Sequence, residues 1–236
     1  MNIALILAGG SGIRTEQDVP KQFLNVYEKP IILYTLEAFQ KHPDINGIIV
    51  SCLEGWHEIL RVYARDVGIT KLQKIVSGGE TGQASARNAL RELNDVCQED
   101  DIVIIHDAIR PMVSADIISD CIVKCRKYGS GLAAMRCQET IIKTEDGVKG
   151  NEGISRKDIM RVQTPQAYRY GRVMKAHEDA LWMGITDAVY TNTLMLDLGE
   201  TLYFSKGSAK NIKITTMEDV EIFKALYRVE KEEWVK

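Results

Sequence analysis

The sequence lacks the features that mark membrane and nucleic-acid-binding proteins. No stretch of its 236 residues approaches the roughly 20 apolar residues that span a bilayer. The short apolar run at the N-terminus has no basic flank or small-residue cleavage site, so a signal peptide is not expected. The formal net charge is −3, which excludes a global basic field for nucleic acid or anionic membrane. Any recognition of phosphate must therefore be local.

Patterned cysteines and histidines are also missing. The five cysteines form no CxxC pair, and their odd number argues against a disulfide framework, so we expect small core residues in a reducing cytoplasm. The four histidines are scattered and suggest no metal centre. No Ser-His-Asp order, HExxH, EF-hand or kinase motif set occurs, which leaves a nucleophilic enzyme poorly supported.

Short β-rich runs alternate with segments of helical period. Strands are predicted at Ile3–Leu7, Ile45–Ser51, Lys74–Val76 and Asp101–Ile105, and helices at Pro30–Lys41, Trp56–Val67, Thr81–Leu93 and Gly171–Met183. Continuously apolar strands alternating with helices indicate an α/β fold, with a mostly parallel sheet covered by helices on both faces. One domain over residues 1–236 is the simplest organisation.

Two segments depart from this rhythm. The stretch MRCQETIIKTEDGVKG alternates apolar and polar residues and turns at Asp146-Gly147, which predicts a β-arm over about residues 136–162. Near the C-terminus, NIKITT is expected to be a strand, followed by a helix that starts with a capping box between Thr215 and Glu218.

The loop after the first strand, AGGSGIR, is rich in glycine but is neither a P-loop nor a GxGxxG motif. Successive glycines can still expose backbone N–H groups to an anion. Arg14 and Lys21 would add the charge that a phosphate chain needs. A tight turn with two surface cations explains the same residues.

The segment HDAIRP ends the strongest predicted strand. Ligands bind beyond the carboxyl ends of the strands in such sheets, so Asp107 could hold Mg²⁺ or a hydroxyl group there. The structural alternative is a turn-capping Asp107 in a salt bridge with Arg110. His106 is expected to be a buried, hydrogen-bonded residue rather than a general base.

Two further stretches are open to two interpretations. SGGETGQAS could let a flat base lie against its glycines, or be a plain Gly-Gly turn. Lys213 lies between Ile212 and Ile214, so its side chain is expected to point away from the apolar side of that strand. It could be a catalytic group there, or a solvated residue of an edge strand.

Taken together, the motifs resemble one family. LAGGSGIR with PKQF, SGGE, HDAIRP, QTPQ, TDA and NIKITT, in this order over residues 3 to 228, are similar to the cytidylyltransferases that act on small polyol phosphates. The resemblance implies a Rossmann-like nucleotidyltransferase fold, Mg²⁺-CTP as the donor, and a homodimer formed through the β-arm.

The resemblance also implies roles for individual residues. Ala8, Gly9, Gly10, Ser11 and Gly12 would wrap the CTP phosphates, while Gly79, Glu80 and Ser85 would meet the cytidine. Arg14, Lys21 and Lys213 would be the catalytic cations. Asp107, Arg110, Thr140, Thr164 and Thr186 would line the acceptor side, where Arg156 would reach from the neighbouring subunit to the acceptor's phosphate.

Some positions differ from the family pattern. Thr81 and Gly82 follow Glu80 where the family usually has an arginine, and the missing basic group puts a strict preference for cytidine in doubt. Glu139 and Thr15 also differ from the family pattern. Thr186-Asp187-Ala188 resembles the branch that makes CDP-ribitol, for teichoic acid or capsule biosynthesis, and this favours ribitol 5-phosphate as the acceptor. The alternative is methylerythritol phosphate, of isoprenoid biosynthesis.

Two other hypotheses remain open on the sequence. One is a sugar-1-phosphate nucleotidyltransferase that uses another nucleotide, suggested by the altered loop at Gly82. The other is a non-catalytic nucleotide-binding regulator, against which the three cations Arg14, Lys21 and Lys213 argue.

Overall fold

The computed structural model describes residues 1–10 and 19–233. Its strands are β1 (Asn2–Ala8), β2 (Asn25–Val26), β3 (Lys29–Pro30), β4 (Gly47–Cys52), β5 (Leu72–Ser77), β6 (Ile102–Asp107), β7 (Ser130–Arg136), β8 (Ile141–Lys143), β9 (Glu152–Ile154), β10 (Met160–Arg169) and β11 (Phe204–Lys206). Its α-helices are α1 (Ile31–Lys41), α2 (His57–Asp66), α3 (Gly82–Arg91), α4 (Ala115–Tyr128), α5 (Tyr170–Trp182), α6 (Thr191–Asp197) and α7 (Met217–Glu233). Short 3₁₀ helices cover Lys21–Phe23 and Arg156–Asp158.

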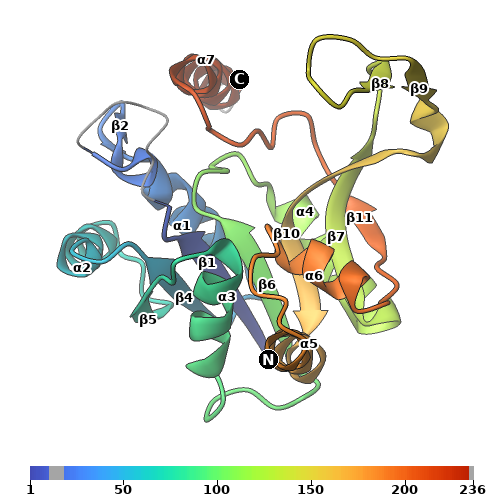
Figure 1. Ribbon diagram of the computed structural model, residues 1–236. Helices are drawn as coiled ribbons and strands as arrows, with labels where there is room; N and C mark the ends of the chain where they lie inside the picture. Colours follow the sequence, from blue (N-terminus) through green and yellow to red (C-terminus); the bar gives the residue numbers. More distant parts are fainter. Residues whose placement is uncertain (11–18, 234–236) are drawn as a thin grey trace.

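A seven-stranded sheet in the order β11-β7-β10-β6-β1-β4-β5 forms the centre of the molecule (Figure 1). β1 pairs in parallel with β4 and β6, and β4 pairs in parallel with β5. β10 is antiparallel to both of its neighbours, while β11 is parallel to β7. The prediction of a mostly parallel sheet is therefore confirmed.

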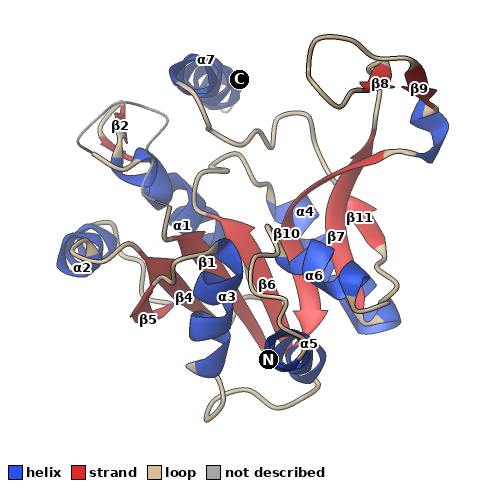
Figure 2. Cartoon of the chain, in the orientation of Figure 1, coloured by secondary structure: helices blue, strands red, loops and turns tan. Residues whose placement is uncertain are grey.

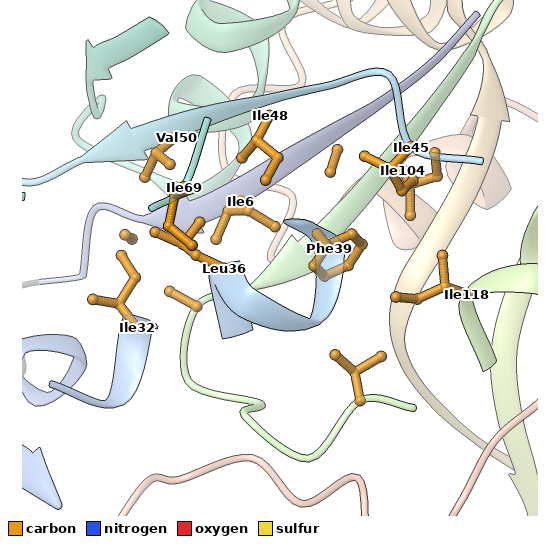
Figure 3. Close-up of a cluster of buried hydrophobic side chains, with 14 of the residues drawn as sticks. Ile6, Ile32, Leu36, Phe39, Ile45, Ile48, Val50, Ile69, Ile104 and Ile118 are labelled. Atoms are coloured by element: carbon orange, nitrogen blue, oxygen red, sulfur yellow. The ribbon is translucent and has the colours of Figure 1, made fainter. Parts of the chain in front are cut away.

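Side chains of the central strands point alternately into two apolar clusters. Ala4 and Ile6 of β1 pack with residues of α1, α2 and α4. Figure 3 shows Ile6 in this cluster with residues of α1 and with Ile118 of α4. Ile3 and Leu5 pack with residues of α3, α5 and α6 on the other face. Burial on both faces explains why these strands are continuously apolar in sequence, and it confirms the predicted covering of the sheet.

The β-arm is the hairpin of β8 and β9, which extends beyond the ends of β7 and β10 (Figure 2). Its turn is held by Asp146, whose Oδ1 accepts from the N–H groups of Val148 and Lys149 at 2.9 and 3.1 Å. Gly147 has a φ of 71°, a conformation that favours glycine. The predicted turn at Asp146-Gly147 is therefore confirmed.

Two predictions near the C-terminus are wrong. Residues 211–214 are a loop, in which Ile214 N donates to Ile109 O without forming a strand ladder. The capping box lies one residue further on: Thr216 Oγ1 accepts from Asp219 N at 3.2 Å, and Asp219 Oδ2 accepts from Thr216 N at 2.8 Å. The sequence alternation showed which way Lys213 points, but not that the backbone lacks a partner strand.

α7 stands apart from the two layers that cover the sheet (Figure 1). It packs on α1 and β2 through a third cluster that includes Tyr34 and Phe223, whose rings meet edge to face with centroids 5.1 Å apart. This packing fixes the helix that follows the 211–215 loop. No helix in the described parts of the chain is long and apolar enough to cross a membrane.

Candidate functional site

Loops from distant parts of the chain meet beyond the carboxyl ends of β1, β5 and β6. The parallel pairing of β1 with β6 and β4, and of β4 with β5, brings these ends to one edge of the sheet. This is the edge at which open α/β sheets bind ligands.

The glycine loops after β1 and β5 are packed against each other. A Cβ on Gly9 would lie 3.2 Å from Ser85 Oγ and 3.5 Å from Gly78 Cα. A Cβ on Gly79 would lie 2.4 Å from the Cβ of Ala84. Ser85 Oγ accepts a hydrogen bond from Gly79 N at 2.9 Å. Gly79 is therefore required by the close approach of Ala84, Gly9 packs tightly against Ser85, and the two predicted nucleotide-binding stretches are neighbours.

The N-terminus of α3 opens into the same region. Thr81 caps the helix, because its Oγ1 accepts from Ala84 N at 3.1 Å. The free N–H groups of a helix start carry partial positive charge and favour a polar or anionic ligand. The side chain of Glu80 is exposed just before this start.

The two central residues of PKQF fasten two different loops. Gln22 Nε2 donates to Ala8 O at 2.7 Å and to Gly10 O at 3.0 Å. Lys21, only 6% exposed, donates from Nζ to the backbone oxygen of Thr215. Ser11, Gly12 and Arg14 lie outside the described residues.

Asp107 is the centre of a charged cluster at the residues predicted to line the acceptor side. Its Oδ2 lies 3.0 Å from Arg110 Nε and 3.2 Å from Lys213 Nζ. Burial raises the pKa of Asp107, but the charges of Lys213 and Arg110 outweigh it and hold the pKa below its usual value. One carboxylate between two cations leaves a net charge of +1, which favours an incoming anion.

Neighbouring backbone and side chains hold this cluster in place. Thr164 Oγ1 accepts from Asp107 N at 3.0 Å. Arg110 Nη1 donates to Asn211 O at 2.8 Å, and Asn211 Nδ2 donates to Thr164 O at 2.8 Å. The predicted salt bridge between Asp107 and Arg110 is confirmed, and it is part of a larger network.

His106 lies behind this cluster and is fully buried. Its Nε2 is 3.2 Å from Arg110 O, and burial lowers its pKa to about 4. The neutral, buried ring agrees with the prediction of a structural histidine.

Lys213 also approaches an aromatic ring. Its Nζ lies 5.1 Å from the ring centroid of Tyr190, a distance suited to a cation–π contact. Lys213 is therefore not a solvated edge residue, because the ion pair and the ring fix the position of its charge.

The residues predicted on the arm and on the TD loop are exposed. Thr140 and Arg156 belong to the arm, where Arg156 Nη1 donates to Gln138 O at 3.0 Å. Thr186 is exposed too, and its backbone oxygen accepts from Thr81 Oγ1 at 3.4 Å. The structure thus brings Thr186 to the start of α3, while Thr140 and Arg156 stay on the arm of the same chain.

Several residues of the site were missed by sequence analysis, namely Gln83, Tyr190 and Asn211. Gln83 carries a detectable signal, since it lies three residues before Ala86 and seven before Leu90 on the buried face of α3. A polar side chain on such a face requires a partner. Tyr190 and Asn211 carry no comparable signal, because their partners are distant in sequence.

The donor set for a metal ion is small. Among residues 1–10 and 19–233, no group of three or more His, Cys, Asp or Glu side chains could hold one. Magnesium in phosphate-transferring sites needs only one or two carboxylates, because substrate phosphates supply further ligands. Asp107 would supply the single carboxylate of such a site, and its Oδ2 already has two cationic partners.

Comparisons with known proteins agree on one family. The family model described as IspD, 2-C-methyl-D-erythritol 4-phosphate cytidylyltransferase, matches residues 2–228. The chain is 47% identical to the ribitol-5-phosphate cytidylyltransferase of Lacticaseibacillus paracasei, over 98% of this chain and 100% of that relative. It is 36% identical to the 2-C-methyl-D-erythritol 4-phosphate cytidylyltransferase of Clostridium botulinum, covering 93% and 94% of the two chains.

Solved structures show the same fold. The 2-C-methyl-D-erythritol 4-phosphate cytidylyltransferase of Francisella tularensis superposes with a TM-score of 0.73 at 29% identity, over 94% of this chain and 97% of that one. The Thermus thermophilus enzyme of the same name gives 0.76 at 24% identity, over 97% and 100%. The predicted Rossmann-like nucleotidyltransferase fold is therefore confirmed.

Proposed function

Because the chain belongs to the IspD cytidylyltransferase family, we propose that it transfers CMP from CTP to D-ribitol 5-phosphate, giving CDP-ribitol and pyrophosphate. Membership makes the chain a nucleotidyltransferase. The observation that carries the choice of acceptor is the 47% identity, over the full length of the relative, to a ribitol-5-phosphate cytidylyltransferase. Relatives named for methylerythritol phosphate are 36% identical.

The proposed reaction requires two anions to meet. A phosphate oxygen of the acceptor attacks the α-phosphorus of CTP, a new P–O bond forms, and the bond from the α-phosphorus to the bridging oxygen breaks to release pyrophosphate. The attacking phosphate is already ionised near pH 7, so no general base is needed. Positioning and charge neutralisation therefore dominate catalysis.

The position of each site residue indicates which part of the substrates it would bind. The backbone of Gly9 and Gly10, with Lys21, would hold the triphosphate, and the start of α3 with Ser85 would hold the nucleoside. Arg110 and Lys213, oriented by Asp107, would receive the acceptor and the charge that grows on the α-phosphate. The predicted roles of Ser11, Gly12 and Arg14 belong to the triphosphate as well.

Mg²⁺ is proposed as the cofactor, with Asp107 as the residue that would hold it, and it would offset the negative charge of the phosphates. The single carboxylate of Asp107 supports a metal held chiefly by the nucleotide. The surplus positive charge around Asp107 supports this division, because it attracts the phosphates that would carry the metal.

A homodimer formed through the β-arm is also proposed. Support comes from the exposed apolar side chains of the arm, Ile142 and Val148, which are 57% and 88% exposed in one chain. Arg156 would then act on the site of the partner subunit.

The five buried, unpaired cysteines fit the predicted reducing cytoplasm.

Pyrophosphate release tests the proposal. The protein is incubated with CTP, Mg²⁺ and either ribitol 5-phosphate or 2-C-methyl-D-erythritol 4-phosphate, and the kcat/KM values are compared. We expect a higher value with ribitol 5-phosphate. The family description favours methylerythritol phosphate as the second candidate, and faster turnover with it would reverse the choice of acceptor.

The choice of nucleotide is tested in the same way. Thr81 and Gly82 follow Glu80, where the family resemblance leads us to expect an arginine, so UTP and other triphosphates are compared with CTP by thermal shift. Stronger stabilisation by a triphosphate without cytidine would favour a different nucleotidyltransferase.

A further inference from the structure

Gln83 holds a backbone turn on the surface of the site. Its Nε2 donates to Ile185 O at 2.7 Å, and its Oε1 accepts from Ala188 N at 2.9 Å. The side chain is 1% exposed, so both of its polar atoms depend on these bonds. The two residues between the bonds, Thr186 and Asp187, are exposed.

Residues 185–190, here called the bridging loop, touch both halves of the site. At one end, Thr81 Oγ1 donates to Thr186 O at 3.4 Å. In the middle, Val189 O lies 3.2 Å from where a Cβ on Gly82 would be. At the other end, Tyr190 places its ring 5.1 Å from Lys213 Nζ. The loop therefore connects the nucleotide helix α3 to the cation paired with Asp107.

We propose that Gln83 is a positioning residue for the transfer reaction, which sets the bridging loop so that Thr186 meets the acceptor and Tyr190 holds Lys213. The inference rests on the proposed function and deepens it. Gln83 contacts the loop and not the reacting atoms, so its effect passes through the loop.

Only a primary amide can make both bonds at this place. Glutamate would keep the acceptor but lose the donor to Ile185 O and bring a buried charge. Methionine would keep the length and volume and lose both bonds. Gln83→Met therefore removes the hydrogen bonds with the least change in packing.

Gln40 provides a matched control on another helix. Its Nε2 donates to Thr70 Oγ1 at 2.9 Å, and its Oε1 accepts from Lys71 N at 2.9 Å. It thus holds a loop to α1 in the same way, but its loop carries none of the site residues. Gln40→Met controls for the general loss of one bridging amide.

The experiment measures kcat and both KM values for wild type, Gln83→Met and Gln40→Met, together with their melting temperatures. For Gln83→Met we expect kcat to fall, because Tyr190 no longer holds Lys213 in place. The KM of ribitol 5-phosphate should rise about tenfold, because a freed loop no longer presents its side chains, while the KM of CTP changes by less than about twofold. Gln40→Met should leave both KM values unchanged.

Equal changes in the two KM values, or changes only in melting temperature, would overturn the proposal. If Gln83→Met does not fold, the contact of the bridging loop with Lys213 is tested by comparing Tyr190→Leu with Tyr190→Phe. Tyr190→Leu removes the ring and should lower kcat, whereas Tyr190→Phe keeps the ring and should not. Failure of the proposed function is distinct: wild type would then be inactive with ribitol 5-phosphate, and the same comparison would be made with methylerythritol phosphate.

Discussion

Lys213 illustrates how much one side chain depends on residues far away in sequence. Its Nζ has the carboxylate of Asp107 at 3.2 Å and the ring of Tyr190 at 5.1 Å. The sequence predicted that Lys213 points away from the apolar side, because Ile212 and Ile214 flank it. It could not predict either partner, since Asp107 ends β6 and Tyr190 lies in the bridging loop, and only the fold joins them to Lys213.

The first prediction concerns this lysine. Lys213→Ala should lower kcat about 100-fold, because a cation that meets charge growing in the transition state contributes on the order of 3 kcal/mol. The KM of CTP should change much less. Steady-state kinetics of pyrophosphate release measure both values.

Lys206→Ala is the control for a lost lysine. Lys206 lies on β11, is 62% exposed and faces Asp116 at 3.5 Å. Its kinetics should match those of wild type. A normal kcat in Lys213→Ala would remove the lysine from the mechanism.

At the scale of elements, α7 determines where the 211–215 loop can lie. Asp219 Oδ2 accepts from Thr215 N at 2.7 Å and from Thr216 N at 2.8 Å at the start of the helix. The loop just before it carries Lys213 and the carbonyl that receives Lys21. A cap on a peripheral helix thereby orients two proposed catalytic cations.

The second prediction tests this link. Asp219→Ala should lower the free energy of unfolding by about 1 kcal/mol through loss of the cap. It should also lower kcat, because the loop loses its anchor. Urea unfolding and steady-state kinetics give the two values.

Asp120→Ala is the control, since Asp120 Oδ2 accepts from the backbone N–H of Lys206 at 2.7 Å on β11, which carries none of the site residues. It should lower stability little and leave kcat unchanged. If Asp219→Ala kept a normal kcat, α7 would have only a structural role.

The elements also show where sequence patterns succeed and fail. The buried strands β1, β4 and β6 were predictable because both faces are apolar. β10 was not predicted: Pro165 interrupts it, and its register shifts between Val162 and Gln166. β11 was not predicted either, because a three-residue edge strand has too few positions to show a period.

For the whole molecule, stability should depend on pH through buried histidines. His177 is fully buried, has Thr191 Oγ1 at 3.5 Å from Nε2, and its pKa is lowered to about 4 by burial and then by the charge of Arg87. The unfolded chain binds more protons than the folded one between this pKa and about 6.5. Stability is therefore complete above about pH 6.5 and falls as the pH drops toward 4.

The third prediction follows from this loss of stability at low pH. The free energy of unfolding of wild type should decrease from pH 7 to pH 4.5, with His177 contributing on the order of 3 kcal/mol when the pH reaches its folded pKa. Urea titrations at several pH values should show a shallower decrease for His177→Gln. Equal slopes for the two proteins would contradict the lowered pKa.

The fourth prediction concerns assembly. If Arg156 acts on the partner's site, the Arg156→Ala and Lys213→Ala proteins are each impaired. Mixing them should form hybrid dimers by subunit exchange, and each hybrid dimer holds one intact site. About a quarter of all sites should therefore be restored. Activity after mixing, compared with the unmixed proteins, measures this. No recovery, with exchange verified by mass, would make Arg156 a residue of its own subunit's arm.

Lys21, Arg110 and Lys213 must gather around a single nucleotide and its acceptor for the proposed reaction to occur. A crystal structure of the protein with CTP and Mg²⁺ tests it most directly. We expect the triphosphate beside Gly9 and Gly10, with the α-phosphate within hydrogen-bond reach of Lys213. A triphosphate bound elsewhere, with Lys213 still held only by Asp107 and Tyr190, would contradict the account.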